Sequence, residues 1–290
     1  MKTKLLVSGF SKFVTEGLSK EFDIIPIGNE EIVPEGDVLL IDSLSKGNEN
    51  FTQQASALKH YAMSKKPIIF IDRYLDMTAE ETEWLKKTNK RVVLFEPAIH
   101  NRRYFSYLPI PVNVKTIDNI YADYEDRDIP LGYIGNIKDK IKSFEKYYVD
   151  FARCYPNNSV YYSGELDDVK EEEYFNTGIK KGFMLNFKDF MYTVAICSQK
   201  EYTLGYLPPV LFDAMDSGCV VLLPEEHRYY HALFKGLIVS SIKDIEYFMN
   251  IYNLTSTGFI LEVYENIGRY YPEFKLNYFV DRIKTVIERL

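Results

Sequence analysis

The chain has 290 residues, 46% of them hydrophobic and 15% aromatic, which is enough for one large or two ordinary packed domains. Its formal charge of −7 at pH 7 argues against a strongly basic domain of the kind that binds nucleic acids. No apolar run reaches the roughly 20 residues of a membrane-spanning helix, and the first residues become polar too early for a secretory signal. We therefore expect a soluble protein of the cytoplasm. Its three cysteines, Cys154, Cys197 and Cys219, are expected to be free thiols because they lack C-x-x-C spacing.

The first hundred residues alternate between short β-rich apolar runs and amphipathic stretches of helix length. Strands are predicted at residues 4–7, 23–27, 37–41, 67–71 and 91–95, and helices at 12–22, 51–64 and 79–87. Strands that alternate with helices favour a parallel sheet covered by helices on both faces. This half is therefore predicted to be a Rossmann-like domain.

The alternation stops between residues 104 and 130, where two prolines and the charged run 123–128 indicate a connector. Beyond it, strands are predicted at 131–136, 159–162, 193–197, 220–223 and 236–239, and helices at 140–154, 210–217, 257–270 and 277–290. We expect two α/β, Rossmann-like domains, residues 1–125 and 126–290, that face each other across a cleft. Ligands of such folds bind at the carboxyl ends of the strands.

Residues 205–221, GYLPPVLFDAMDSGCVV, place one carboxylate inside a predicted helix. Pro208 and Pro209 precede this helix, and Asp213 lies near its first turns. A carboxylate at that position stabilises the helix dipole. It can also accept hydrogen bonds from both ribose hydroxyls of a nucleotide, as acidic residues do in dinucleotide-binding folds. The residues alone leave both interpretations open.

A second motif follows the predicted strand 131–136, which ends in Gly135 and Asn136 and leads into a lysine-rich helix. Backbone N–H groups of such a turn, together with Lys138 and Lys142, are suited to binding a diphosphate. The alternative is a solvated helix face, because the same spacing of four residues is typical of one.

Residues 205–221 resemble the donor-site motif of GT-B glycosyltransferases, commonly written P-x-x-x-x-E-A-x-A-x-G-x-P-V-V, and especially its CgeB-like version. The resemblance covers about residues 130–290. It implies that Asp213 holds the donor ribose at a helix start built by Pro209, and that Gly135, Asn136 and a basic residue, Lys138 or Lys142, bind the diphosphate. Many retaining members carry a second glutamate eight residues before the ribose-binding acid, but Gly205 occupies that position here.

Two residues of the N-terminal half follow predicted strands. Gly9 lies in the loop that, in the GT-B family, touches the donor phosphate or the acceptor. Asp72 is a candidate catalytic residue that would orient or deprotonate an acceptor hydroxyl. The alternative for Asp72 is a loop carboxylate whose hydrogen bonds are satisfied within the protein.

No motif requires a metal. The D-x-D match at residues 126–128 lies in the connector and does not follow a strand. His227 and His231 have H-x-x-x-H spacing without an evident third ligand. We therefore expect a nucleotide-sugar donor, with no metal and no covalently bound cofactor.

These observations predict a glycosyltransferase that moves a sugar from a nucleotide-sugar, expected to be a UDP-sugar such as UDP-glucose, to an acceptor hydroxyl with retention. The first choice of acceptor is a hydroxymethylated or already glycosylated base in double-stranded bacteriophage DNA, because the short N-terminal half resembles enzymes of that kind; the protein would then work in the host cytoplasm. The alternatives are a bacterial surface or spore-coat glycan as acceptor, and a non-catalytic nucleotide-sugar-binding protein, which the missing acid at Gly205 favours.

Overall fold

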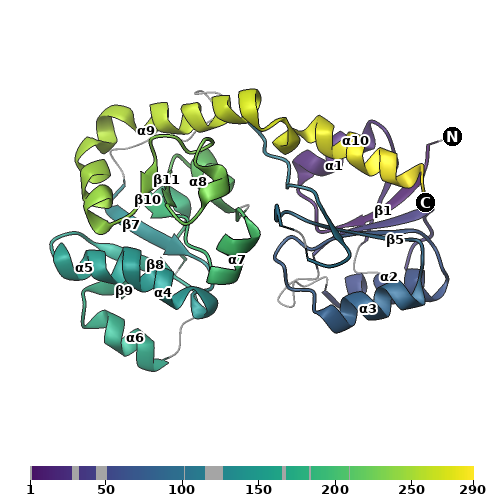
Figure 1. Cartoon of the computed structure of the whole chain (residues 1–290), viewed down its shortest axis with the longest axis horizontal. Helices are drawn as coiled ribbons and strands as arrows, with labels where there is room; N and C mark the ends of the chain where they lie inside the picture. The colour runs from purple at the N-terminus through teal and green to yellow at the C-terminus, as the bar shows by residue number, and fades with distance from the viewer. Residues whose placement is uncertain are drawn as a thin grey trace. The chain divides into compact units, whose positions relative to one another are not determined.

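The computed structural model forms two compact units, each with its own parallel sheet (Figure 1). Unit 1 contains Met1–Asn113 and Pro272–Leu290, and unit 2 contains Val114–Tyr271. The residues that the structure describes are 2–27, 33–43, 51–100, 102–114, 127–164, 168–182, 184–208 and 210–290.

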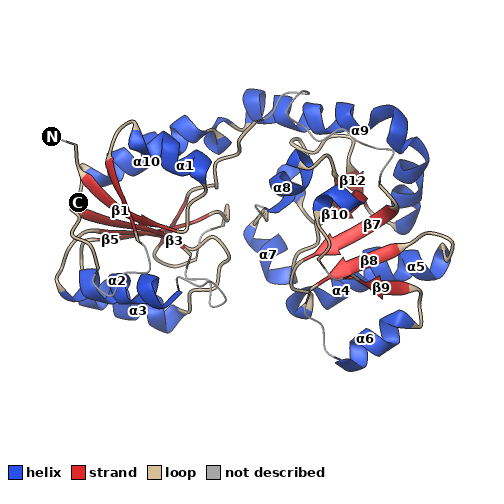
Figure 2. Ribbon diagram, turned by 180° about the vertical axis from the view of Figure 1, so that it is seen from behind, coloured by secondary structure: helices blue, strands red, loops and turns tan. Residues whose placement is uncertain are grey.

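Unit 1 is a three-layer α/β domain whose sheet has the strand order β2-β1-β3-β4-β5-β6. The strands are β1 (Lys4–Ser8), β2 (Asp23–Pro26), β3 (Val38–Asp42), β4 (Ile68–Ile71), β5 (Val92–Glu96) and β6 (Phe105–Tyr107). Helices α1 (Lys12–Ser19) and α10 (Leu276–Ile287) cover one face, and α2 (Phe51–Met63) and α3 (Ala79–Thr88) cover the other (Figure 2).

The sequence of β1 shows why both faces are covered. Leu5 and Val7 belong to the core beneath α1 and α10, whereas Leu6 belongs to the core beneath α2 and α3. Side chains of a strand alternate between the two faces of a sheet, so a continuous apolar run needs a helical layer on each side. The predicted doubly covered parallel sheet is confirmed.

The last helix returns to the first unit. Phe279 and Ile283 of α10 are fully buried against the sheet, and Lys284 Nζ lies 2.8 Å from Glu21 Oε2. An ideal Cβ on Gly17 of α1 would lie 2.6 Å from Leu276 Cδ2, so the close approach of the two helices depends on this glycine. The predicted split into 1–125 and 126–290 differs from the compact units, because the apolar face of α10 completes the core of unit 1.

Unit 2 has the strand order β12-β11-β10-β7-β8-β9. Its strands are β7 (Ile129–Ile134), β8 (Val160–Ser163), β9 (Ile179–Lys181), β10 (Phe190–Val194), β11 (Val220–Pro224) and β12 (Ile238–Val239). The first three strands run outward from β7 in one direction, and the chain then crosses back to place the last three on its other side. This is the Rossmann order, with its reversal between β7 and β10.

The helices of unit 2 connect these strands. They are α4 (Ile141–Phe144), α5 (Asp150–Cys154), α6 (Asp168–Phe175), α7 (Gln199–Leu204), α8 (Val210–Asp216) and α9 (Ile242–Tyr270). A π-helical turn, Glu145–Val149, joins α4 to α5, so the predicted helix 140–154 is present with a local change of pitch. The short elements β6, β9, α6 and α7 and the first half of α9 were not predicted.

The fold class is confirmed as α/β with two Rossmann-like domains. The cleft between them remains a prediction. Cys154, Cys197 and Cys219 are free thiols, as expected. Among the described residues, no helix is long and apolar enough to cross a membrane.

Candidate functional site

The point where the strand order of unit 2 reverses is the candidate site. Strands β7 and β10 pair at Ile129 with Phe190 and at Leu131 with Tyr192. Beyond this pairing, the Tyr148 hydroxyl lies between the strands: it accepts a hydrogen bond from Val194 N (2.7 Å), and Gly132 O lies 3.3 Å from it. The phenol thus replaces a direct strand-to-strand bond at the carboxyl ends. In open α/β sheets, this reversal is where ligands bind.

The π-helical turn brings two neighbouring tyrosines to separate partners. Tyr148 is fully buried between β7 and β10, whereas Tyr147 donates a hydrogen bond to Glu226 Oε2 (2.9 Å) in the loop after β11. Burial raises the pKa of both phenols, so each stays protonated and able to donate. The helix after β7 is thereby tied to the ends of β10 and β11.

The turn after β7 has the geometry that its sequence suggests. Gly135 has φ +141°, and its N–H donates to Ser163 O (3.0 Å). An ideal Cβ on Gly164 would lie 2.0 Å from Gly135 O, so a second glycine permits this approach. Asn136 is exposed, and its Oδ1 accepts a hydrogen bond from Lys138 N (2.9 Å). Gly135 and Asn136 therefore form a compact turn beside the reversal; that this turn binds a phosphate stays a prediction.

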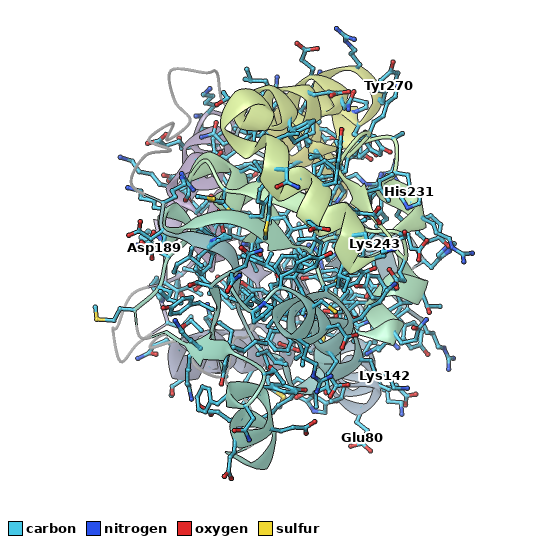
Figure 3. All side chains as sticks on the ribbon, turned by 90° about the vertical axis from the view of Figure 1, so that its left-hand side faces the viewer. Glu80, Lys142, Asp189, His231, Lys243 and Tyr270 are labelled. Carbon is cyan, nitrogen blue, oxygen red and sulfur yellow. The ribbon has the colours of Figure 1, made fainter. Side chains whose placement is uncertain are left out.

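The three lysines of this segment differ in burial. Lys138 and Lys142 are exposed, and Lys142 lies at the margin of the molecule in Figure 3. The Lys140 side chain is only 19% exposed, and its Nζ lies 3.8 Å from Glu201 Oε1 at the start of α7. The sequence interpretation missed Lys140 because the segment opens as a 3₁₀ turn, Lys138–Lys140, which changes the phase of the helix.

The loop after β10 is held by hydrogen bonds with buried and half-buried side chains. Ser143 Oγ donates to Cys197 O (2.9 Å), and Cys197 N donates to the Tyr202 hydroxyl (3.0 Å). His227, 1% exposed, contacts Ala195 O through Nε2 (2.8 Å). Burial lowers the pKa of His227 to about 4, so the imidazole is neutral at pH 7 and its Nε2 donates. Its Nδ1 is buried and has no hydrogen-bond partner among the described residues.

The histidine pair considered for a metal has other contacts. His231 Nε2 lies 3.0 Å from the Glu225 carbonyl, and His227 Nε2 contacts the Ala195 carbonyl. Within the described ranges, no group of three or more His, Cys, Asp or Glu side chains is arranged to hold a metal ion.

The segment around Asp213 explains the missing acid. Helix α7 ends at Leu204 and is capped by Gly205, whose φ of +64° is the left-handed conformation of a helix C-cap; Tyr206 N donates to Glu201 O (3.0 Å). A side chain at this position would strain the backbone, which accounts for glycine where a second glutamate occurs in the resembling family. Asp213 is exposed in the first turn of α8. Pro209 lies outside the described residues.

The candidate residues of unit 1 have internal roles in the structure. Asp72 is 2% exposed; it accepts hydrogen bonds from Asp76 N (3.0 Å) and Met77 N (2.8 Å) and pairs with Arg102 Nη2 (2.5 Å). Arg102 also pairs with Glu96, at 2.6 Å. The geometry therefore supports the satisfied loop carboxylate, because both Asp72 oxygens already have partners within the protein.

Gly9 lies at the carboxyl end of β1 with φ +89°. An ideal Cβ at this position would lie 2.0 Å from Asp42 O. Only glycine fits so close to the end of β3 without displacing the backbone. The loop is thus placed at the strand-order reversal of unit 1, between β1 and β3.

Comparison with known proteins gives similar folds without a matching family. No family model matches the chain, and no curated protein matches it. The structure of Anabaena HepE in complex with UDP-glucose has a TM-score of 0.57 at 10% identity, with 100% of both chains covered. HepE has also been crystallised with UDP and with UDP and glucose.

Two further structures are similar over most of this chain. TarM has a TM-score of 0.52 at 11% identity and covers 86% of this chain, which spans about half, 54%, of TarM. A UDP-forming α,α-trehalose-phosphate synthase from Burkholderia xenovorans, in complex with glucose-6-phosphate, has a TM-score of 0.50 at 10% identity, with 87% of this chain and 72% of that chain covered. At these identities the likeness shows the fold alone, which is two Rossmann-like domains.

Proposed function

We propose that the protein is a glycosyltransferase that takes a sugar from a nucleotide-sugar, expected to be a UDP-sugar, and transfers it to an acceptor hydroxyl. The main support for this proposal is the Rossmann strand order of unit 2. In this order the Gly135–Asn136 turn lies beside the reversal between β7 and β10. The likeness to HepE over the whole of both chains, in a complex that contains UDP-glucose, supports the same choice of donor.

In this proposal unit 2 binds the donor. Asp213, in the first turn of α8, accepts hydrogen bonds from the ribose hydroxyls, with Pro209 as a further donor-binding residue, and the turn of Gly135 and Asn136 holds the diphosphate. A leaving diphosphate requires cations, because negative charge develops on it as the sugar departs. Lys138 and Lys142 remain candidates for this role. We add Lys140 as a third candidate, because it is partly buried and lies between the segments that follow β7 and β10.

Unit 1 would present the acceptor, with Gly9 in the loop at the carboxyl end of β1. Because Asp72 is paired with Arg102, we do not assign it the role of catalytic base. We propose instead that a β-phosphate oxygen of the leaving diphosphate takes the acceptor proton, while the bond from C1 to the phosphate oxygen breaks and the bond from C1 to the acceptor oxygen forms. Transfer on one face in this way retains the anomeric configuration, which NMR of the product would establish.

The direct test is nucleotide binding by the whole chain. We expect UDP and UDP-glucose to raise the melting temperature, because a ligand of the native state stabilises it by mass action. Asp213→Ala should weaken both ligands by roughly 10- to 100-fold, since it removes charge-assisted hydrogen bonds. Asp150→Ala is the matched control: Asp150 is an exposed carboxylate of unit 2 that pairs only locally, with Arg153 at 3.3 Å. Failure of every uridine, adenosine and guanosine nucleotide to bind would overturn the proposal.

For the acceptor, we propose a hydroxymethylated or already glycosylated base in bacteriophage DNA. The support is the resemblance of the short N-terminal half to enzymes that modify such DNA. Labelled UDP-glucose should transfer its sugar to hydroxymethylcytosine DNA and not to ordinary DNA. Transfer to a bacterial surface or spore-coat glycan, with none to any modified DNA, would replace this acceptor with the alternative.

A nucleotide-sugar-binding protein without transferase activity is the second candidate. The observation that favours it is glycine at position 205, where many retaining members carry a glutamate and where a φ of +64° disfavours a larger residue. Slow hydrolysis of UDP-glucose in the absence of acceptor, abolished by Asp213→Ala, would rule against a purely binding role.

A further inference from the structure

The ion pair between Lys140 and Glu201 connects the segments that follow β7 and β10. Lys140 closes the 3₁₀ turn after β7, and Glu201 lies in the first turn of α7, which follows β10. Lys140 Nζ and Glu201 Oε1 are 3.8 Å apart, and the two side chains are 19% and 16% exposed. Because β7 and β10 are the strands at the reversal, this pair spans the place where the proposed donor would bind.

Glu201 is held in place by the start of its own helix. Its Oε2 accepts a hydrogen bond from Ser198 N (2.6 Å), and its backbone N–H donates to Ser198 Oγ (3.3 Å), which together form a capping box. One carboxylate oxygen therefore fixes the helix start, and the other is directed to Lys140. The capping role of Glu201 does not require its negative charge, because glutamine serves equally at this position of a capping box.

The charges of Glu201 and Lys140 act on side chains at the ends of β7 and β10. Burial raises the pKa of Cys197, the third residue after β10; the charge of Glu201 raises it further and that of Lys140 lowers it. The charge of Glu201 also raises the pKa of Tyr133, in β7, after the larger effect of burial. A carboxylate and an ammonium are thus present together beside both strands.

We propose that Glu201 is an internal anion that pairs with Lys140 in the absence of ligand and yields this lysine to the diphosphate of the donor, so that it sets the affinity for donor and product. This inference rests on the proposed function. A diphosphate and a carboxylate compete for one ammonium group, and the carboxylate that remains nearby repels the bound diphosphate. Glu201 therefore weakens donor binding and favours release of the nucleoside diphosphate.

The test is calorimetric titration of UDP and UDP-glucose into the whole chain carrying Glu201→Gln. The substitution keeps the capping box and removes the charge. We expect both ligands to bind roughly three- to tenfold more tightly, a change of the size expected for a partly exposed ion pair. The gain should be equal for the two ligands, because they share the diphosphate, and it should shrink as salt is raised.

Glu171→Gln is the matched control. Glu171 also belongs to unit 2, pairs with Lys181 at 3.0 Å and is 15% exposed, close to the 16% of Glu201, but it has no place at the β7–β10 reversal. We expect its affinity for UDP to equal that of the wild type. Lys140→Met should weaken both ligands, and in that background Glu201→Gln should bring a smaller gain than in the wild type, because the competition for Lys140 is absent and only the repulsion between the carboxylate and the diphosphate remains.

The outcomes separate this inference from the proposed function. Wild-type protein that binds no nucleotide would overturn both. Wild-type binding that Glu201→Gln leaves unchanged would overturn only the inference. Loss of affinity for UDP-glucose alone would also overturn it, because Glu201 would then be accepting a hydrogen bond from a sugar hydroxyl. If Glu201→Gln proves unfolded by circular dichroism, Lys140→Met decides: unchanged UDP affinity in that variant contradicts the competition for this lysine.

Discussion

The two units share a layered architecture, yet the carboxyl edges of their sheets differ in chemistry. At the edge of unit 1, Asp42 pairs with Arg73, and Arg102 joins Asp72 to Glu96; the three carboxylates are at most 3% exposed. The edge of unit 2 carries a glycine turn, a lysine paired with Glu201 at 3.8 Å, and the buried Nδ1 of His227, which has no hydrogen-bond partner among the described residues. The three buried carboxylates of unit 1 are paired with arginines at short distance. In unit 2, Lys140 lies 3.8 Å from Glu201 and can form a closer pair with an anionic ligand.

The two units also differ in what lies between the strands at the point where the strand order reverses. In unit 1 the reversal lies between β1 and β3, and the Gly9 backbone is packed against Asp42 O. In unit 2 the Tyr148 hydroxyl separates β7 from β10. A parallel sheet with helices on both faces therefore does not by itself make a ligand site; what fills the reversal decides it.

The largest effect should come from breaking the charge network of unit 1. Arg102→Met leaves Asp72 and Glu96 buried without their cation, and we expect a loss of about 3 to 5 kcal/mol in the free energy of unfolding. Denaturant titration measures it. The control, Lys87→Met, removes an exposed pair with Glu83 and should cost less than about 1 kcal/mol. A similarly small cost for Arg102→Met would contradict the inference that Arg102 neutralises Asp72 and Glu96 at the carboxyl edge of the unit 1 sheet.

The next effect is a pH dependence that originates in unit 2. The pKa of His227 falls from an ordinary value of 6.5 to about 4 because the ring is buried, so its contribution to stability is complete above pH 6.5 and is lost as the pH falls towards 4. The loss should be on the order of 3 kcal/mol. His227→Gln keeps a donor for Ala195 O and should flatten this part of the curve, measured as urea stability from pH 7 to pH 4.

Unit 1 supplies a contribution of opposite sign over the same range. Burial raises the pKa of Asp42 to about 6, against the opposing charge of Arg73. The stability that belongs to the protonated form is present below the ordinary value of 3.8 and is lost as the pH rises through 6. An identical pH profile for wild type and His227→Gln would show that His227 is not the titrating group.

A smaller effect is expected where Tyr148 separates the strands. Tyr148→Phe leaves the buried N–H of Val194 without its acceptor, at a cost of about 1 to 3 kcal/mol. Denaturant unfolding gives the cost, and UDP titration shows whether the reversal keeps its shape. Tyr247→Phe, a change at a tyrosine that is 61% exposed, is the control. Unchanged stability in Tyr148→Phe would mean that β7 and β10 close up and form a direct bond.

The smallest effect distinguishes the lysines. Lys142 is exposed and Lys140 is partly buried beside the reversal. We expect Lys142→Met to weaken UDP by about twofold and Lys140→Met by about tenfold, because a desolvated cation attracts phosphate more strongly than a solvated one. Equal losses in the two variants would restore the sequence-based choice of Lys142.

The fold was largely predictable because its strands are continuous apolar runs bounded by helix patterns. The runs at β1, β3, β4, β5 and β11 are buried on both faces, and the sequence shows this directly. The three-residue strands β6 and β9 and the six-residue helix α7 were missed because such short elements carry too few residues for a period to show.

For the candidate site, the sequence by itself determined the Gly135–Asn136 turn after a strand and an acid in the first turn of α8, because glycine and proline report local backbone geometry. Only the tertiary structure decided the strand order, the return of α10 to unit 1, the ion pairing of Asp72 and the meeting of Lys140 with Glu201. The physical reason is that these features depend on groups that lie far apart in the chain and are brought together by burial. Local propensity carries no information about such partners.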